Sequence, residues 1–193
     1  MIAALVLAGG RASRLGGGDK PLLPLAGATL LDILLARLRP QVSALAISAN
    51  GDPARFARFG LPVLPDAPGH AGPLAGVAAG MEWAARQGAD TLLTVPGDTP
   101  FIPEDLATRL GAAPAWAVSD GAVHPLIALW PAAEAARLNA WVADGHDLRV
   151  KSFGASLLMR AVAFEETPDP FFNINTPADL AKAQARAATL PAR

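Results

Sequence analysis

A glycine-rich, cationic segment near the start of the chain has the residue types that bind phosphate. It runs from Leu7 to Lys20 with the sequence LAGGRASRLGGGDK. Glycines let backbone N–H groups approach a ligand without a Cβ in the way, and successive N–H groups form anion-binding nests. Arg11, Arg14 and Lys20 add three cations to the segment. A solvated surface loop is the alternative. We favour polyphosphate binding because the segment directly follows an apolar run and is rich in cations.

This segment departs from the two commonest phosphate-binding motifs. It lacks the spacing G-x-x-x-x-G-K-[ST], since Lys20 is followed by Pro21 instead of a hydroxyl residue. It also lacks G-x-G-x-x-G directly after the apolar run. A P-loop NTPase and a dinucleotide-dependent dehydrogenase are therefore both disfavoured.

Asp98 is the candidate metal ligand. It follows the apolar run 91–95 and lies between Gly97 and Thr99. Mg²⁺ takes one or two protein carboxylates and keeps several waters, so a carboxylate here could hold an ion that bridges to substrate phosphates. The alternative is a cap of the following turn, which Thr99 could provide instead.

Asn50 and Asp66 follow two further apolar runs and are candidates for nucleoside binding. A carboxylate can accept hydrogen bonds from the ring N–H and the exocyclic amine of guanine. Singly, each residue is equally well explained as a turn residue, but together and near a phosphate loop they predict a nucleoside pocket. The small residues of 72–76 would let a flat base approach a helix start, although close helix–sheet packing explains them too.

Asn173 and Asn175 are candidates for binding a second ligand. They stand two residues apart before Thr176, so an extended backbone places them on one side. The alternative is a capping turn, which Thr176 alone would satisfy. His124 lies within an expected hairpin strand and could face a second substrate, whereas His70 is better explained as a loop residue.

These residues can form one site only if the fold brings the ends of several strands together. Apolar runs predict strands at 2–7, 42–49, 61–64 and 91–95, and helical spacing predicts helices over 30–38 and from Pro73 to about Gln87. Four βα units imply right-handed crossovers and a doubly wound sheet. In such sheets ligands bind beyond the carboxyl ends of the strands, where the polar residues above are expected.

The second half of the sequence has a different pattern. Runs at 115–119 and 122–129 flank the turn Asp120-Gly121 and predict an antiparallel hairpin. A helical pattern at 132–143, a strand near 161–164 and a final helix that Thr176 caps follow. With no repeat and no long linker, we expect one α/β domain with a mixed sheet over residues 1–193.

Composition excludes several functions. The chain has 193 residues, 52% of them hydrophobic, and 16 basic against 17 acidic residues give a net charge of −1. That balance gives no electrostatic footprint for nucleic acid or for an acidic membrane surface. The absence of cysteine excludes disulfides and thiolate sites. The first apolar run is too short to span a membrane and lacks the flanks of a signal peptide, so the expected location is cytoplasmic.

The motifs in this order resemble the molybdenum cofactor guanylyltransferases, which are MobA-like nucleotidyltransferases. The resemblance runs from Leu7 to about Leu180, and Leu15 replaces the family's usual Met, a volume-conserving change. It implies a single-domain, Rossmann-like, three-layer α/β/α fold with a mostly parallel mixed sheet. Residues 1–100 would form a nucleotide-binding half and 101–193 an acceptor or pterin-binding half. The matching motifs are 7–20, 48–50, Asp66, 72–76, 96–101, 124–126 and 173–177.

The resemblance also implies a reaction, in which GMP passes from GTP to the terminal phosphate of molybdopterin or Mo-molybdopterin and pyrophosphate is released. Mg²⁺ is the implied cofactor, with Asp98 as its ligand, and Lys20, Asp98 and Arg14 are the implied catalytic residues. Molybdenum-insertion proteins and apo-molybdoenzymes or their chaperones are candidate partners. Asn173 and Asn175 correspond to pterin-side residues. The residues implied to bind GTP are Leu7, Ala8, Gly9, Lys20, Asn50, Asp66 and Asp98.

Three alternatives remain open on the sequence. A molybdopterin cytidylyltransferase would carry an Ala-Ala-Gly form of the first loop, whereas Ala8-Gly9-Gly10 has the guanine form. A sugar-phosphate nucleotidyltransferase could share that loop, but the motif at 173–177 and the short chain argue against it. A non-catalytic nucleotide-binding protein would have no need to keep both Lys20 and Asp98.

Overall fold

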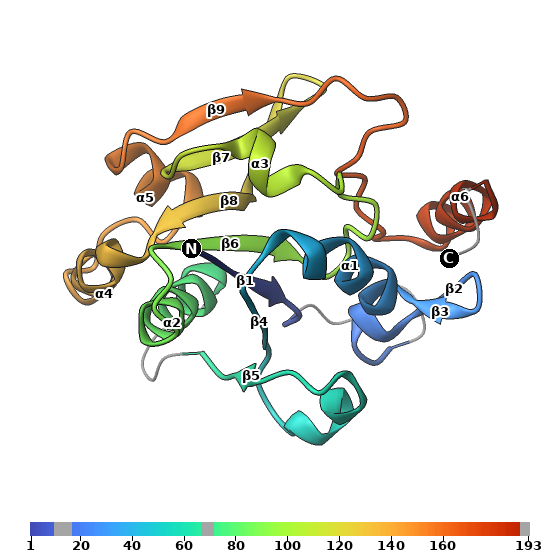
Figure 1. Ribbon diagram of the computed structural model, residues 1–193, viewed down its shortest axis with the longest axis horizontal. Helices are drawn as coiled ribbons and strands as arrows, with labels where there is room; N and C mark the ends of the chain where they lie inside the picture. Colours follow the sequence, from blue (N-terminus) through green and yellow to red (C-terminus); the bar gives the residue numbers. More distant parts are fainter. Residues whose placement is uncertain (10–16, 67–71, 190–193) are drawn as a thin grey trace.

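A seven-stranded mixed sheet forms the centre of the molecule (Figure 1). The computed structural model describes residues 1–9, 17–66 and 72–189. Strands β5, β4, β1 and β6 are parallel, β8 is antiparallel to its neighbours β6 and β7, and β9 is parallel to β7. Across the sheet the order is β5 (Val63–Leu64), β4 (Ala44–Ser48), β1 (Ile2–Leu7), β6 (Thr91–Pro96), β8 (Ala122–Pro131), β7 (Ala115–Ser119) and β9 (Arg160–Ala163).

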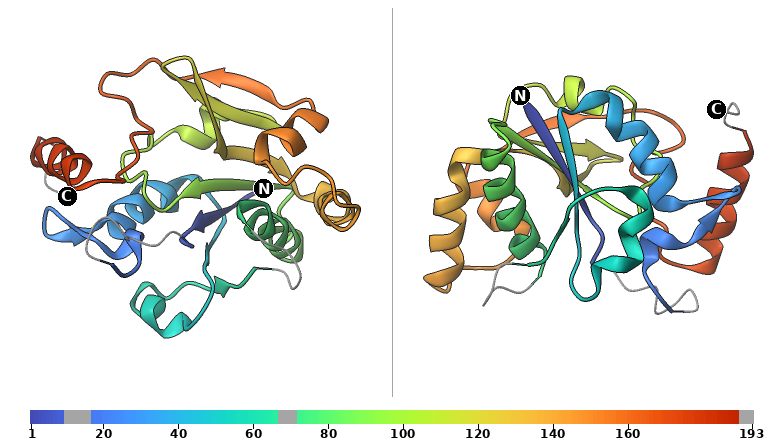
Figure 2. Two further views of the ribbon diagram at one scale, coloured as in Figure 1. Left: turned by 180° about the vertical axis from the view of Figure 1, so that it is seen from behind. Right: turned by 60° about the horizontal axis from the view of Figure 1, so that its bottom comes forward.

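Helices cover both faces of this sheet, as Figure 2 shows. One face packs against α1 (Leu30–Leu38), the 3₁₀ helix η3 (Pro53–Phe59) and α3 (Leu106–Leu110). The other packs against α2 (Pro73–Arg86), α4 (Ala135–Ala143), which follows the 3₁₀ helix η4 (Ala132–Glu134), and α5 (Val150–Ser156). The mostly parallel mixed sheet between helical layers that the sequence predicts is confirmed.

Strand β1 is continuously apolar because it is buried on both faces of the sheet. Ala4 and Val6 belong to the hydrophobic cluster on the α1 side, whereas Ala3 and Leu5 belong to the cluster on the α2 side. All four are fully buried. Successive side chains of a strand point to opposite faces, so a strand covered on both sides needs apolar residues at every position.

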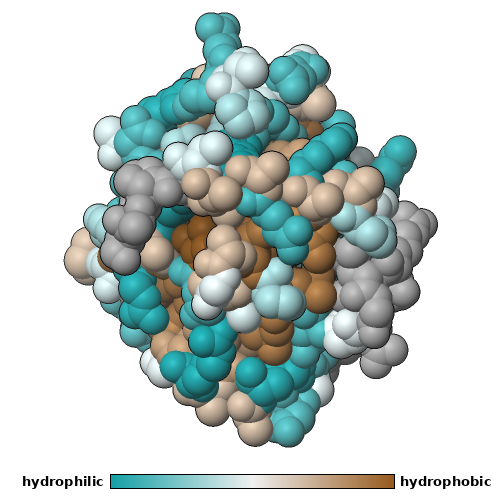
Figure 3. Space-filling model, turned by 90° about the vertical axis from the view of Figure 1, so that its right-hand side faces the viewer, coloured by the Kyte–Doolittle hydropathy of each residue, from teal (hydrophilic) through white to brown (hydrophobic). Residues whose placement is uncertain are grey.

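A third hydrophobic cluster joins the two ends of the chain. It packs α6 (Pro177–Ala188) against the small hairpin of β2 (Pro24–Leu25) and β3 (Ala28–Thr29), with Leu25, Phe101 and Ile174 buried between them. Figure 3 shows this side of the molecule, where hydrophobic residues are visible among hydrophilic ones. The cluster holds the segment before α6 close to the N-terminal half.

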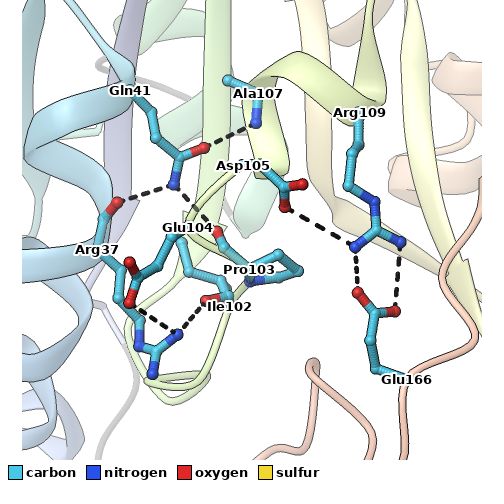
Figure 4. A network of polar contacts seen from close by, with 9 residues as sticks. All are labelled: Arg37, Gln41, Ile102, Pro103, Glu104, Asp105, Ala107, Arg109 and Glu166. Carbon is cyan, nitrogen blue, oxygen red and sulfur yellow. Dashed lines mark hydrogen bonds and ion pairs between the residues drawn. The ribbon is translucent and has the colours of Figure 1, made fainter. Parts of the chain in front are cut away.

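Side-chain hydrogen bonds join α1 to α3 (Figure 4). Gln41, at the end of the 3₁₀ helix η2 (Arg39–Gln41), donates its amide to Arg37 O at 2.8 Å and Pro103 O at 3.0 Å. Its amide oxygen accepts from Ala107 N at 2.9 Å, which satisfies a first-turn N–H of α3. On the other side of α3, Arg109 pairs with Glu166.

The structure corrects part of the predicted element pattern. The hairpin of β7 and β8 and the final helix are confirmed, and Thr176 forms a capping box with Asp179. The expectation of four βα units is wrong, since η3 joins β4 to β5 and only the five-residue α3 follows β6. Pro53 begins η3 and the left-handed Gly60 (φ 64°) ends it, which limits this helix to seven residues. The β2–β3 hairpin and α5 are not predicted by the sequence patterns.

Within the described part of the chain, none of the helices combines the length and apolar character that a membrane crossing requires.

Candidate active site

The register of the parallel strands brings the predicted polar residues to one edge of the sheet. Leu7 of β1 lies opposite Ser48 of β4 and Pro96 of β6, and Ser48 lies opposite Leu64 of β5. The residues that follow each strand therefore emerge side by side. They border a cavity of about 440 Å³, lined by Leu7, Gly9, Lys20, Pro21, Ser48, Ala49, Asn50, Asp66, Gly72, Pro73, Gly76, Pro96, Asp98 and Leu126.

Lys20 and Asp98 form an ion pair in this cavity. Lys20 Nζ donates to Asp98 Oδ2 at 2.9 Å, although 78 residues separate them in the sequence. The two side chains are only 14% and 18% exposed. Lys20 Nζ also donates to Asn175 Oδ1 at 2.5 Å. Three segments that are distant in sequence thus meet at one ammonium group.

Close packing of backbone fixes the position of Lys20. It is the first residue of the 3₁₀ helix η1 (Lys20–Leu22), which Pro21 initiates. Pro21 lies against Gly97, where an added Cβ would stand 2.6 Å from Pro21 Cγ and 3.3 Å from Leu7 O. Real Cβ contacts are not this short, so only glycine lets η1 sit on the end of β6.

Asp98 has the features of a metal ligand. Thr99, not Asp98, caps the turn after β6, since Thr99 Oγ1 donates to Pro96 O at 2.7 Å. The second carboxylate oxygen of Asp98, Oδ1, is buried and has no hydrogen-bond partner among the described residues. A buried acceptor without a partner costs free energy, and an Mg²⁺ ion would satisfy it. In the same residues no cluster of three or more His, Cys, Asp or Glu side chains could hold an ion, so most of the ligands of an ion here would be water or substrate oxygens.

Asn50 and Asp66 form a reciprocal pair at the opposite end of the cavity. Asn50 Nδ2 donates to Asp66 Oδ2 at 2.7 Å, and Asp66 N donates to Asn50 Oδ1 at 2.9 Å. These bonds tie the end of β4 to the end of β5. Gly76 of α2 lies beside them, where an added Cβ would stand 2.7 Å from Ser48 Oγ. The absence of a side chain at Gly76 lets α2 approach the strand ends, and Gly76 and Asp66 both line the cavity.

Asn173 and Asn175 lie on one side of an extended segment, as the sequence predicts. Both are exposed and the intervening Ile174 is fully buried. Thr176 and Asp179 cap α6 through a capping box, so the amide side chain of neither asparagine is needed as the cap. Neither asparagine is part of the cavity lining, but Asn175 contacts the lining residue Lys20.

Some predicted site residues lie elsewhere. Ala8 is buried behind the cavity, and its N–H bonds to Ser48 O at 2.8 Å. Arg14, together with Arg11 and His70, lies outside the described residues. The lining role of Pro21 and the contact between Asn175 and Lys20 are not predicted by the sequence. A proline directly after the loop lysine is the one signal that could have identified the first of these.

A second hollow of about 670 Å³ adjoins the first, and Pro73 and Leu126 line both. Arg149, Lys151 and Ser152 at the start of α5 also line it. Ser152 Oγ donates to Asp147 at 2.5 Å. This hydrogen bond, followed by those from Arg149, lowers the pKa of Asp147 to about 2. Asp147 is therefore ionised at neutral pH and bridges Arg149 and Ser152.

Comparison with known proteins agrees with this geometry. Residues 4–159 match the MobA-like NTP transferase domain. The chain is 57% identical to the molybdenum cofactor guanylyltransferase of Acidiphilium cryptum, over 94% of this chain and 93% of that protein. It is 52% identical to the Rhodobacter capsulatus protein of the same name, over 96% of each.

Solved structures share the fold at low sequence identity. Molybdopterin-guanine dinucleotide biosynthesis protein A from Archaeoglobus fulgidus superposes with a TM-score of 0.73 at 22% identity, covering 98% of this chain and 100% of that one. A 4-diphosphocytidyl-2C-methyl-D-erythritol synthase from Anaerococcus prevotii reaches 0.70 at 13% identity, covering 97% and 96%. These two structures show that the chain shares their fold. The chain is a nucleotidyltransferase and belongs to the molybdenum cofactor guanylyltransferase family of MobA-like NTP transferases.

Proposed function

We propose that this enzyme transfers GMP from GTP to the terminal phosphate of molybdopterin or Mo-molybdopterin, giving molybdopterin guanine dinucleotide and pyrophosphate. The observation that carries the proposal is the Lys20–Asp98 ion pair at 2.9 Å inside a cavity that also contains Asp66. A cation and a carboxylate with an unsatisfied oxygen suit a triphosphate with its metal ion. The carboxylate at the other end suits guanine.

GTP would lie along the cavity. The guanine would lie at the end of the cavity lined by Gly76 and Asp66, and the Asp66 carboxylate would accept from the ring N–H and the exocyclic amine. The ribose would lie near Asn50, and the triphosphate would extend over Leu7, Ala8 and the backbone of Gly9 towards Lys20. Residues 1–100 then supply the nucleotide-binding half, and 101–193 supply the acceptor half.

In the reaction, a terminal phosphate oxygen of molybdopterin forms a new bond to the α-phosphorus of GTP. The bond from that phosphorus to the oxygen shared with the β-phosphate breaks, and pyrophosphate leaves. A phosphate monoester is already anionic near neutral pH, so no protein base has to remove a proton. Catalysis then comes from positioning and from stabilisation of charge.

Lys20 and Asp98 would divide this work. In the structure Lys20 donates to Asp98 and Asn175. In this proposal its ammonium lies beside the path of the α-phosphate. On nucleotide binding it would turn to the phosphate oxygens and offset the charge that develops there, with Arg14 as a second cation. Asp98 would hold Mg²⁺, which supplies neutralisation of the phosphate charges. Asn173 and Asn175 would contact the pterin side.

Beyond its substrates, the enzyme would act in the cytoplasm. Its proposed protein partners are molybdenum-insertion proteins and apo-molybdoenzymes or their chaperones. No nucleic-acid partner is expected, because the net charge is −1.

Pyrophosphate release tests the proposal. The enzyme is incubated with Mg²⁺, molybdopterin and GTP, CTP or ATP in turn. We expect release with GTP at least about 100-fold faster than with the other nucleotides, because a hydrogen-bonding pocket rejects a base that leaves its groups unpaired. Faster release with CTP would identify a cytidylyltransferase. Turnover with a sugar 1-phosphate in place of molybdopterin would identify a sugar-phosphate enzyme, and tight GTP binding without turnover would contradict catalysis.

A further inference from the structure

A partly buried chain of polar side chains links the β7–β8 hairpin to the loop that precedes α6. His124 of β8 has its Nε2 2.7 Å from Ser119 Oγ of β7. Ser119 Oγ in turn donates to Asp169 Oδ1 at 2.8 Å. The His124 ring also packs on the Phe171 ring, with centroids 5.0 Å apart. The reaction proposed above uses none of these four residues.

This arrangement is not a nucleophilic triad. A serine hydroxyl has one proton, and Ser119 donates it to Asp169, so His124 Nε2 must itself donate to Ser119 Oγ. In a Ser-His-Asp triad the histidine accepts from the serine and the carboxylate holds the histidine. Ser119 is also only 4% exposed, which leaves no room for a substrate. Instead, His124 donates to Ser119, and Ser119 donates to the Asp169 carboxylate.

Asp169 uses these bonds to fix the loop. The same Oδ1 atom accepts from Phe171 N at 2.9 Å, which closes a tight turn. The Asp169 carbonyl accepts from the Arg186 guanidinium of α6 at 2.6 Å. Arg186 is held in turn over the Phe101 ring, 4.4 Å from its centroid. Asp169 is thus tied to the hairpin on one side and to α6 on the other.

The loop that Asp169 fixes also contacts two residues of the active site, Asp98 and Lys20. Five residues after Asp169, Ile174 N donates to Asp98 O at 3.1 Å. The next residue, Asn175, holds the Lys20 ammonium at 2.5 Å. A lysine side chain has a flexible four-carbon stem, so its ammonium keeps a fixed position only if its hydrogen-bond partners are themselves fixed. The position of Lys20 therefore depends on the position of the loop.

We propose that Asp169, held by Ser119 and His124, is a positioning residue that sets Asn175 and hence Lys20 for the transfer step. The role in the transfer step rests on the proposed function, whereas the ordering of the loop does not. Loss of the Asp169 carboxylate would release residues 170–175 from the hairpin and would leave Asn50 and Asp66, which bond to each other, in place.

Three variants test this. Asp169→Ala removes the acceptor, and Asp169→Asn keeps an oxygen that can replace Oδ1. Glu166→Ala is the matched control, because it removes a carboxylate from the same loop whose partner, Arg109, lies on α3 away from the cavity. For each we measure kcat, the KM for both substrates, the Kd for GTP, and amide hydrogen exchange over residues 170–175.

We expect Asp169→Ala to lower kcat about 10- to 100-fold, since small misplacements of catalytic groups cost this much. Its Kd for GTP should stay within about twofold of the unmodified enzyme, and exchange over 170–175 should be at least about tenfold faster. Asp169→Asn should restore most of both properties. Glu166→Ala should leave kcat and exchange over 170–175 unchanged.

Two outcomes would overturn the proposal. One is unchanged exchange and kcat in Asp169→Ala, and the other is an equal fall of kcat in Glu166→Ala. If Asp169→Ala does not fold, Ser119→Ala decides, and wild-type exchange and kcat in that variant would also overturn it. An unmodified enzyme that cannot transfer GMP at all would refute the proposed function. Hydrogen exchange would still test whether Asp169 orders the loop.

Discussion

At the scale of single residues, the site depends on what Asp98 does with its two oxygens. One oxygen accepts from Lys20, and the other is buried without a partner among the described residues. An aspartate that served only the fold would have both oxygens satisfied or solvated. The unsatisfied oxygen is the local reason to place a divalent cation here.

Asp98→Asn tests that role. The amide keeps the shape of the side chain but loses the charge, so we expect kcat to fall about 10²- to 10³-fold. Binding of GTP should lose its dependence on Mg²⁺, as measured by calorimetry with and without the ion. The thermal midpoint should change little, because Lys20 keeps its bond to Asn175.

Asp90→Asn is the matched control for that experiment. Asp90 precedes the strand that Asp98 follows, is 86% exposed at its side chain, and pairs only with the N-terminal ammonium among the ion pairs of the described residues. Turnover of Asp90→Asn should match the unmodified enzyme. Turnover of Asp98→Asn at the wild-type rate would contradict the role of Asp98 as a metal ligand.

At the scale of elements, the 3₁₀ helix η1 presents Lys20 by packing on the end of β6. Gly97→Ala would place a Cβ 2.6 Å from Pro21 Cγ. We expect η1 to shift and kcat to fall at least about tenfold, because Lys20 moves with it. The double variant Gly97→Ala/Pro21→Ala removes the colliding Cγ and should recover part of kcat. No recovery would mean that Gly97 acts through something other than this contact.

Gln41 joins α1, η2 and α3 through one side-chain amide (Figure 4). Gln41→Leu keeps a similar volume but leaves Ala107 N and Pro103 O without this partner. We expect the free energy of unfolding to fall by about 2–3 kcal/mol, measured by urea denaturation, with kcat unchanged. A loss of kcat at unchanged stability would show that this network acts on the site instead.

The sequence predicts elements well where one physical signal dominates. The continuous apolar run of β1, the Asp120-Gly121 turn and the Thr176 cap each specify their element locally. The segment between Pro53 and Gly60 does not specify its element locally, because its conformation depends on how Phe56 packs into the hydrophobic cluster on the α1 side of the sheet. The β2–β3 hairpin has strands of two residues, too short for any periodicity.

In the site as well, some contacts follow from the sequence pattern and others depend on long-range packing. The convergence of Lys20, Asp98, Asn50 and Asp66 follows from the rule that ligands bind at the carboxyl ends of parallel strands. The contact between Lys20 and Asn175 spans 155 residues, and it depends on how α6 packs on the β2–β3 hairpin. Nothing in the spacing of either motif encodes that packing. The bond between Ser119 and Asp169 spans 50 residues and is likewise not encoded in the sequence pattern.

At the scale of the whole molecule, His124 couples folding stability to pH. Burial is the main cause that lowers its pKa below the ordinary 6.5, and Lys151 adds to this. The charges of Asp169 and Asp120 oppose the shift. Below pH 6.5 the unfolded chain therefore binds a proton that the folded chain does not, so this contribution to stability is present above 6.5 and is lost as pH falls.

We expect the urea midpoint of the enzyme to fall between pH 7 and pH 5.5. His124→Gln should flatten the dependence in this range, because it removes the titrating group. His146, an exposed histidine after α4, supplies the control His146→Gln, which should keep the wild-type slope. Equal slopes in all three proteins would contradict the assignment to His124.

We propose that GMP transfer takes place in the cavity that Lys20 and Asp66 line. The most direct measurement follows GTP labelled at its α-phosphate when it is incubated with Mg²⁺ and molybdopterin. We expect the label to appear in a molybdopterin product with the unmodified enzyme. Lys20→Met should slow this transfer about 10²- to 10³-fold while GTP still binds. Label that stays in the nucleotide with the unmodified enzyme, or transfer at the wild-type rate by Lys20→Met, would contradict it.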